Sequence, residues 1–149
     1  MSRRSRRRYS VRHGERGFTL VEILVVITII GMIMALVGPR VINYLSESKA
    51  KTAKIQIESF GSALDLFYLD AGRYPASAEG LRALLERPGN TALWNGPYLK
   101  GNLVPNDPWG RPYVYRSPGQ YGVYDILSYG ADGQEGGAGA AADITSWTK

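Results

Sequence analysis

The hydrophobic positions of this chain begin with one long apolar run. From Phe18 to Pro39 the sequence spans 22 residues and contains a single charged side chain, Glu22. As an α-helix this run would be about 33 Å long, against a hydrocarbon core of roughly 30 Å. The pattern therefore predicts a helix that can cross a membrane.

After Pro39 the apolar positions recur at helical spacing. Steps of 4, 3, 4 and 3 residues place five of them on one face of a helix: Ala53, Ile57, Phe60, Leu64 and Phe67. We expect one continuous rod from Phe18 to about Asp70, on the order of 80 Å long. A bend or local melting is expected at Pro39, because proline has no amide hydrogen and clashes with the preceding turn. Gly72 suits the C-terminal cap.

The remainder of the chain is rich in glycine, proline and aromatic residues, which is typical of short strands and ordered loops. A short helix is expected over residues 78–87, with Ser77 as its N-cap. Strands are expected over residues 113–115 and 124–129, in a small antiparallel sheet. Such a sheet is marginal alone, so it should pack on the apolar stripe of the long helix. The fold class is therefore α+β, with a long N-terminal helix and a small C-terminal antiparallel sheet.

The positive charge of the chain is concentrated at its start. Residues 1–17 hold seven arginines against one glutamate and contribute +6, whereas the whole chain carries +5. Residues 18–149 therefore carry −1 and have no basic footprint for nucleic acid. We interpret the arginines as a topology signal rather than a DNA-binding arm. By the positive-inside rule they keep the N-terminus in the cytoplasm.

The composition argues against catalysis. The chain has no cysteine, and its one histidine, His13, precedes the apolar run. If residues 1–17 are removed as a leader, a Ser-His-Asp triad, a Cys-His pair and the usual zinc sites are all excluded. We therefore expect a non-enzymatic protein, and a membrane-anchored periplasmic enzyme is the alternative class.

Two ordinary explanations of the N-terminal region are incomplete. A secretory signal peptide usually has an apolar region of about 7 to 15 residues and a small-x-small cleavage site, whereas this run is longer and no convincing site follows it. A plain membrane anchor leaves Glu22 unexplained, because a carboxylate inside the membrane costs about 2.5 to 3.5 kcal/mol. Glu22 therefore either lies near the interface or needs a partner.

The N-terminal motif resembles that of a known superfamily. A basic leader that ends in Gly17, followed by Phe-Thr-Leu-Val-Glu and an apolar helix, resembles the N-terminus of type IV pilins and of the pseudopilins of type II secretion systems. The resemblance implies that a prepilin peptidase cuts between Gly17 and Phe18 and that the new amino group of Phe18 is methylated. It also implies that Glu22 neutralises the N-terminal ammonium of a neighbouring subunit in the apolar fibre core.

Four further motifs narrow the resemblance. Residues 69–75 (LDAGRYP), 94–98 (WNGPY), 107–113 (DPWGRPY) and 124–133 (YDILSYGADG) together resemble the major pseudopilins of type II secretion systems. The resemblance implies a subunit that polymerises with itself into a periplasmic pseudopilus and drives the export of folded proteins across the outer membrane. The implied partners are minor pseudopilins, a prepilin peptidase and the inner-membrane secretion platform. The alternative is the major subunit of a type IV pilus, which is normally longer and disulfide-bonded.

The same resemblance divides the chain into three segments. Residues 1–17 are a leader that is removed, and residues 18–39 form the transmembrane helix, which becomes the fibre core. Residues 40–149 form a periplasmic head that includes the amphipathic half of the long helix. The expected location is the inner membrane, crossed once, and then a periplasmic fibre after assembly.

The glycine-rich stretch of residues 133–142 is accompanied by four side chains that carry oxygen: Asp132, Glu135, Asp143 and Thr145. Hard oxygen donors on a flexible loop suit calcium, although Asp-Gly is also a common turn and the spacing is not that of an EF-hand. The resemblance implies a structural calcium ion held by two aspartates, a serine or threonine, and backbone carbonyls. Asp132, Asp143 and Thr145 match those positions.

Overall fold

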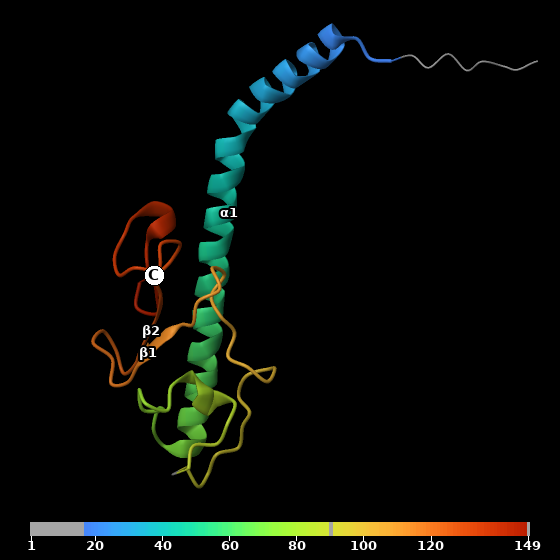
Figure 1. The fold of residues 1–149 in the computed structure, drawn as a ribbon. Coiled ribbons are helices and arrows are strands. Elements are labelled where there is room, and N and C mark those ends of the chain that lie inside the picture. Colours follow the sequence, from blue (N-terminus) through green and yellow to red (C-terminus); the bar gives the residue numbers. More distant parts are fainter. Residues whose placement is uncertain (1–16, 90, 149) are drawn as a thin grey trace, which may run out of the picture. The chain divides into compact units, whose positions relative to one another are not determined.

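In the computed structural model, one helix dominates the chain (Figure 1). The structure describes residues 17–89 and 91–148. Helix α1, Leu20–Ala71, is 52 residues long and continues through Pro39. The helix therefore does not melt at Pro39, and the bend expected there stays a prediction. Contacts within the chain divide it into two units, Met1–Pro39 and Arg40–Lys149.

The part of α1 in the first unit is exposed along its length. Its apolar side chains lie open, as at Leu20 (83% exposed), Ile30 (49%) and Leu36 (66%). Among the described residues, α1 is the one helix that is long and apolar enough to cross a membrane. The described residues supply no cover for this surface, so lipid or other chains must cover it.

The part of α1 in the second unit buries one stripe of side chains. The five positions predicted from the sequence are each at most 3% exposed: Ala53, Ile57, Phe60, Leu64 and Phe67. This result confirms the predicted helical period. The outer face of the same helix stays exposed, as at Ile55 (66%) and Leu69 (76%).

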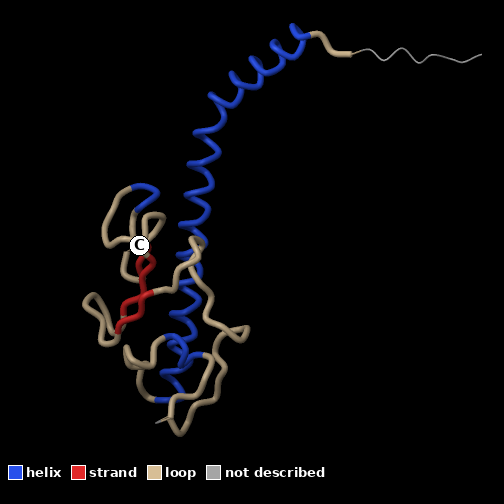
Figure 2. Tube along the Cα trace, in the orientation of Figure 1, coloured by secondary structure: helices blue, strands red, loops and turns tan. Residues whose placement is uncertain are grey.

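A three-stranded antiparallel sheet packs against this stripe (Figure 2). Its strands are β1 (Val114–Arg116), β2 (Asp125–Ser128) and β3 (Ile144–Thr145), in the order β1-β2-β3. The aromatic rings of Phe60 and Tyr113 pack edge to face, with 5.1 Å between their centroids. The two strands expected from the sequence are confirmed with small shifts at their ends. The sequence did not predict β3.

A glycine cap ends α1, and a salt bridge lies just beyond it. Gly72 has a φ of 70°, and its N–H donates to the carbonyl of Tyr68 at 2.8 Å, which confirms the expected glycine cap. Beyond it, the guanidinium of Arg73 pairs with both carboxylate oxygens of Glu79, at 2.7 and 2.8 Å. Hydrogen bonding from Arg73 lowers the pKa of Glu79 below its ordinary value.

The short helix expected over residues 78–87 is wrong in extent and type. The structure has a 3-10 helix, η1, over Leu81–Leu84. Gly80 before it has a φ of 62°, a left-handed conformation that an α-helix cannot contain. Ser77 does not cap this helix. Its Oγ donates to the carbonyl of Ser117 at 3.0 Å and accepts from the N–H of Ser117 at 2.8 Å, so it joins this segment to the end of β1.

Candidate functional site

The N-terminal end of α1 carries a reciprocal cap. The backbone N–H and the hydroxyl of Thr19 both donate to Oε2 of Glu22, each at 2.9 Å. The N–H of Glu22 donates back to Oγ1 of Thr19 at 3.2 Å. This pattern is a capping box, which satisfies donors that a helix start leaves unpaired. Glu22 therefore has a partner within its own chain.

The proposed cleavage position lies just before this cap and is open. Phe18 is 80% exposed. A side chain added at Gly17 would meet no atom within 4 Å. The fold itself therefore does not require glycine at position 17, and any such requirement must come from a protein that binds here. The remaining residues of the predicted leader, 1–16, lie outside the described residues.

The glycine-rich stretch belongs to a loop over residues 130–142, called the glycine-rich loop below, which closes on itself next to β3. A Cβ added at Gly130 would lie 2.6 Å from the carbonyl oxygen of Ala142, so the two ends of the loop touch. Pairing of β2 with β3 holds both ends, through the pairs Ser128–Ile144 and Leu127–Thr145. Asp143 directly precedes β3, and Thr145 is its last residue and is 8% exposed.

Both predicted aspartate ligands face the same short part of this loop. Oδ1 of Asp132 accepts a hydrogen bond from the N–H of Gln134 at 3.1 Å. Oδ2 of Asp143 accepts one from the N–H of Gly136 at 2.9 Å. The other oxygen of Asp143, Oδ1, is buried and has no hydrogen-bond partner among the described residues. A buried carboxylate oxygen without a donor is costly unless something else satisfies it.

The third predicted ligand is engaged by the C-terminal segment. Oγ1 of Thr145 contacts Oγ1 of Thr148 and accepts a hydrogen bond from its N–H at 3.2 Å. Glu135 is exposed. Within the described part of the chain, no three His, Cys, Asp or Glu side chains are grouped as a metal site. A site here therefore needs hydroxyl or carbonyl oxygens besides the two carboxylates.

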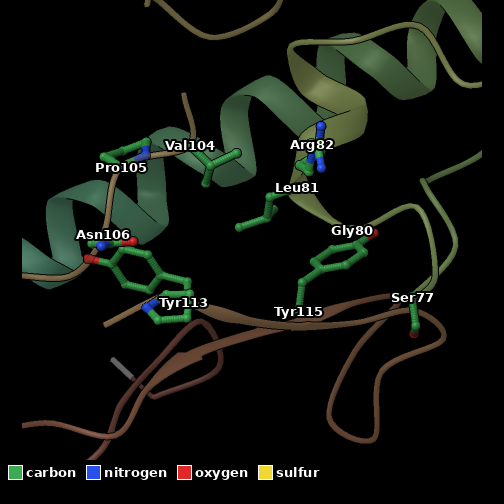
Figure 3. A pocket seen from close by; sticks show the side chains of 10 residues that line it. Ser77, Gly80, Leu81, Arg82, Val104, Pro105, Asn106, Tyr113 and Tyr115 are labelled. Atoms are coloured by element: carbon green, nitrogen blue, oxygen red, sulfur yellow. The ribbon is translucent and has the colours of Figure 1, made fainter. Parts of the chain in front are cut away.

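A pocket of about 290 Å³ lies beside η1. Figure 3 shows Leu81 and Val104 facing the rings of Tyr113 and Tyr115 across it. None of the described residues that line it is a carboxylate or a histidine. Burial raises the pKa of both Tyr113 and Tyr115, so their phenols stay protonated near neutral pH and are poor bases there.

Comparison with known proteins assigns the family. Residues 40–147 match the family model described as "Type II secretion system (T2SS), protein G". Residues 12–38 match the "Prokaryotic N-terminal methylation motif". The chain belongs to the type II secretion system protein G family.

Individual relatives support the same family assignment. It is 45% identical to the type II secretion system core protein G of Pseudomonas aeruginosa, over 91% of this chain and 97% of that protein. It is 40% identical to the core protein G of Vibrio cholerae, over 89% and 92%. The crystal structure of the major pseudopilin from the type 2 secretion system of enterohaemorrhagic Escherichia coli matches with a TM-score of 0.62 at 31% identity, over 72% of this chain and 94% of that one.

Membership of the protein G family confirms the function expected from the sequence. The chain is a structural pseudopilin subunit of a type II secretion system and not an enzyme. The type IV pilus alternative is not favoured. The apolar N-terminal part of α1 and the family together fit a protein anchored in the inner membrane. Membership also implies assembly into a pseudopilus with other components of the system.

Two residues that contact the candidate sites, Thr19 and Arg111, were not predicted from the sequence. Thr19 could have been found, because Thr-x-x-Glu before an apolar run is the signature of a capping box. Arg111 gave no such signal. Its Nη2 donates to the carbonyl oxygen of Gly130, at the start of the loop, and only the fold brings these residues together.

Proposed function

We propose that the chain is inserted in the inner membrane with its N-terminus in the cytoplasm and its head in the periplasm. A prepilin peptidase then cuts between Gly17 and Phe18, and the new amino group of Phe18 is methylated. The processed subunits polymerise into a helical periplasmic fibre. With minor pseudopilins and the inner-membrane platform, the growing fibre pushes folded proteins across the outer membrane.

The observation that carries this proposal is the uncovered apolar part of α1 with a carboxylate in its first turn. Nothing in the described chain packs on this part of the helix, so its stable environments are lipid and the helices of other subunits. The carboxylate of Glu22 remains exposed while Thr19 holds it. A second donor can therefore reach it, and the ammonium of a neighbouring Phe18 would supply a full opposite charge in an apolar surrounding.

Glu22→Gln tests this role of the carboxylate. Glutamine preserves the capping box but removes the negative charge, so helix start and insertion should persist while the pairing with an ammonium is lost. We expect normal cleavage by mass spectrometry, and few or no fibres in sheared fractions and in electron micrographs. Glu58→Gln is the matched control. Glu58 is an exposed glutamate in the part of α1 that belongs to the second unit, and this variant should form fibres normally. Wild-type amounts of fibre from Glu22→Gln would contradict the proposal.

We also propose that the loop between Asp132 and Asp143 holds a structural calcium ion, with Thr145 as a further ligand. Residues 131–140 are almost all exposed and bury little, whereas fixing each residue costs roughly 1 to 2 kcal/mol of backbone entropy. An ion offers a reason for the loop to stay folded. The buried, unpartnered Oδ1 of Asp143 supports this assignment, because a carboxylate oxygen is a preferred calcium ligand.

The donor set fits calcium better than a softer metal. The two carboxylates, the hydroxyl of Thr145 and nearby backbone carbonyls are all oxygen donors, and the whole chain has no cysteine. When bound, calcium would supply positive charge between two carboxylates that both lie against residues 134–136. It would thereby link the start of the loop to β3.

A further inference from the structure

Arg111 braces the start of the glycine-rich loop. Its Nη2 donates to the carbonyl oxygen of Gly130. Its guanidinium also lies flat against Gly133, where an added Cβ would come within 2.8 Å of Nη1 and 2.9 Å of Cζ. One side chain therefore contacts the loop on both sides of Asp132.

The position of Arg111 is itself fixed by a buried carboxylate. Oδ1 of Asp107 accepts a hydrogen bond from the N–H of Arg111 at 2.8 Å, and the N–H of Asp107 donates to the carbonyl of Arg111 at 2.7 Å. Oδ2 of Asp107 accepts from the hydroxyl of Ser128, the last residue of β2, at 2.6 Å. Asp107 and Ser128 are 4% and 1% exposed, so this connection is part of the core.

Ser128, which is hydrogen-bonded to Asp107, also binds the backbone of Gly130. The N–H of Gly130 donates to Oγ of Ser128 at 3.4 Å, while its carbonyl accepts from Arg111. Gly130 is thus held at both its backbone polar groups by the turn at residues 107–111 and the end of β2. With φ values of 61° and 72°, Gly130 and Gly133 both have a conformation that favours glycine. The path of the chain between them is therefore closely determined.

We propose that Arg111 is a positioning residue for the calcium loop. By holding the carbonyl of Gly130 and packing on Gly133, Arg111 fixes the backbone on both sides of Asp132. The carboxylate of Asp132 is then already in its binding position before calcium binds. This inference rests on the calcium site proposed above. Arg111 is a cation and cannot be a ligand, so its action passes through the backbone of the loop.

The charge of Arg111 and its contacts with the loop have opposite effects on the affinity for calcium. A guanidinium near the loop repels a divalent cation, so its charge alone would make calcium bind more weakly. The bracing contacts reduce the ordering that binding must accomplish, and loss of residues that orient metal ligands typically costs 10- to 100-fold in affinity. The direction in which affinity changes on removal of Arg111 therefore separates the two effects.

The experiment measures calcium binding to the full chain in detergent by isothermal titration calorimetry, starting from chelator-treated protein. Arg111→Ala should raise the dissociation constant about tenfold or more. Arg111→Lys should recover part of this loss, because its ammonium can still donate to Gly130 but cannot cover Gly133. The matched control is Arg116→Ala, which removes the same charge from an exposed position on β1. Its dissociation constant should stay within about twofold of wild type.

Thermal melting in chelator supplies a second measurement. If Arg111 were merely structural, Arg111→Ala would lower the calcium-free melting temperature and leave the dissociation constant unchanged, which would overturn the proposal. Tighter binding by Arg111→Ala would also overturn it, because the charge would then dominate. If Arg111→Ala does not fold, Arg111→Lys provides the test. A dissociation constant severalfold above that of wild type would support the proposal, and an unchanged dissociation constant would refute it. Absence of calcium binding by the wild type would instead refute the calcium site itself, and this inference with it.

Discussion

Replacing Asp143 by asparagine is expected to remove the calcium dependence of the stability of the head. Asparagine keeps an oxygen that can accept from the N–H of Gly136, now bonded at 2.9 Å, but loses the charge that the ion requires. If the proposed ion binds only the folded loop, calcium at 100 times its dissociation constant would stabilise the wild type by about 2.7 kcal/mol. For a domain near 100 residues, 1 kcal/mol shifts the melting temperature by roughly 4 °C. Chelation should therefore lower the wild-type melting temperature by about 10 °C.

The assay compares thermal melts of the full chain in detergent, followed by near-UV circular dichroism, in millimolar calcium and in excess chelator. The difference between the two conditions is the measured quantity, since Asp143→Asn can also change the calcium-free stability. Glu135→Gln is the matched control. Glu135 lies exposed in the same loop and is outside the proposed ligand set, so this variant should keep nearly the whole shift.

Two results would refute this reasoning. Equal wild-type melting temperatures with calcium and with chelator would leave Asp132 and Asp143 as turn-forming residues only. If Glu135→Gln abolished the shift as fully as Asp143→Asn, general attraction of cations to the loop would explain the effect, and coordination by a defined set would not.

Three further predictions concern processing and the head. Gly17→Val should leave the precursor uncut, because the peptidase must accept this residue at the membrane face; mass spectrometry showing the normal mature N-terminus would contradict this. Phe67→Ala should cost about 3 to 5 kcal/mol in urea unfolding, since Phe67 is 0% exposed, whereas Leu69→Ala, at 76% exposed, should change stability by less than about 0.5 kcal/mol. The pKa of Glu79 is lowered in the folded head, so its pairing with Arg73 stabilises the head above the ordinary carboxyl pKa and is lost as pH falls through the lowered pKa. Glu79→Gln should therefore cost about 1 kcal/mol at pH 7, a small value because Arg73 is 35% exposed, and the difference from wild type should vanish in acid; a constant difference at every pH would exclude this cause.

The parts of the fold in which a periodic pattern extends over many residues could be predicted from the sequence. The stripe from Ala53 to Phe67 repeats over four turns, so each position supports the others, and all five predicted residues are buried. Gly72 was predictable as a cap because only glycine adopts its conformation easily. The candidate ligands could be selected only through resemblance, since their spacing alone fits a turn equally well.

The parts that depend on a single backbone angle or a distant partner could not be predicted. The expected helix over residues 78–87 had a suitable leucine pattern, but the positive φ of Gly80 interrupts a helix at that residue, and a 3-10 helix over Leu81–Leu84 follows it. Strand β3 has two residues and derives its stability from pairing with β2, so no local pattern marks it. The contact of Arg111 with Gly130 joins residues 19 positions apart in sequence and depends on the pairing of β1 with β2 between them.

The cap at the start of α1 shows how Glu22 can have a partner before subunits assemble. A carboxylate in the membrane costs about 2.5 to 3.5 kcal/mol, which favoured either a place at the interface or a partner. Thr19 provides a partner in the same chain, and its two donors offset part of that cost before any neighbour arrives. If the monomer is stored in the membrane as proposed, this cap lowers the cost of keeping Glu22 ionised there. In the proposed fibre, the ammonium of a neighbouring Phe18 would add a full opposite charge that the neutral donors of Thr19 lack. The carboxylate of Glu22 would then be stabilised more in the assembled fibre than in the stored subunit.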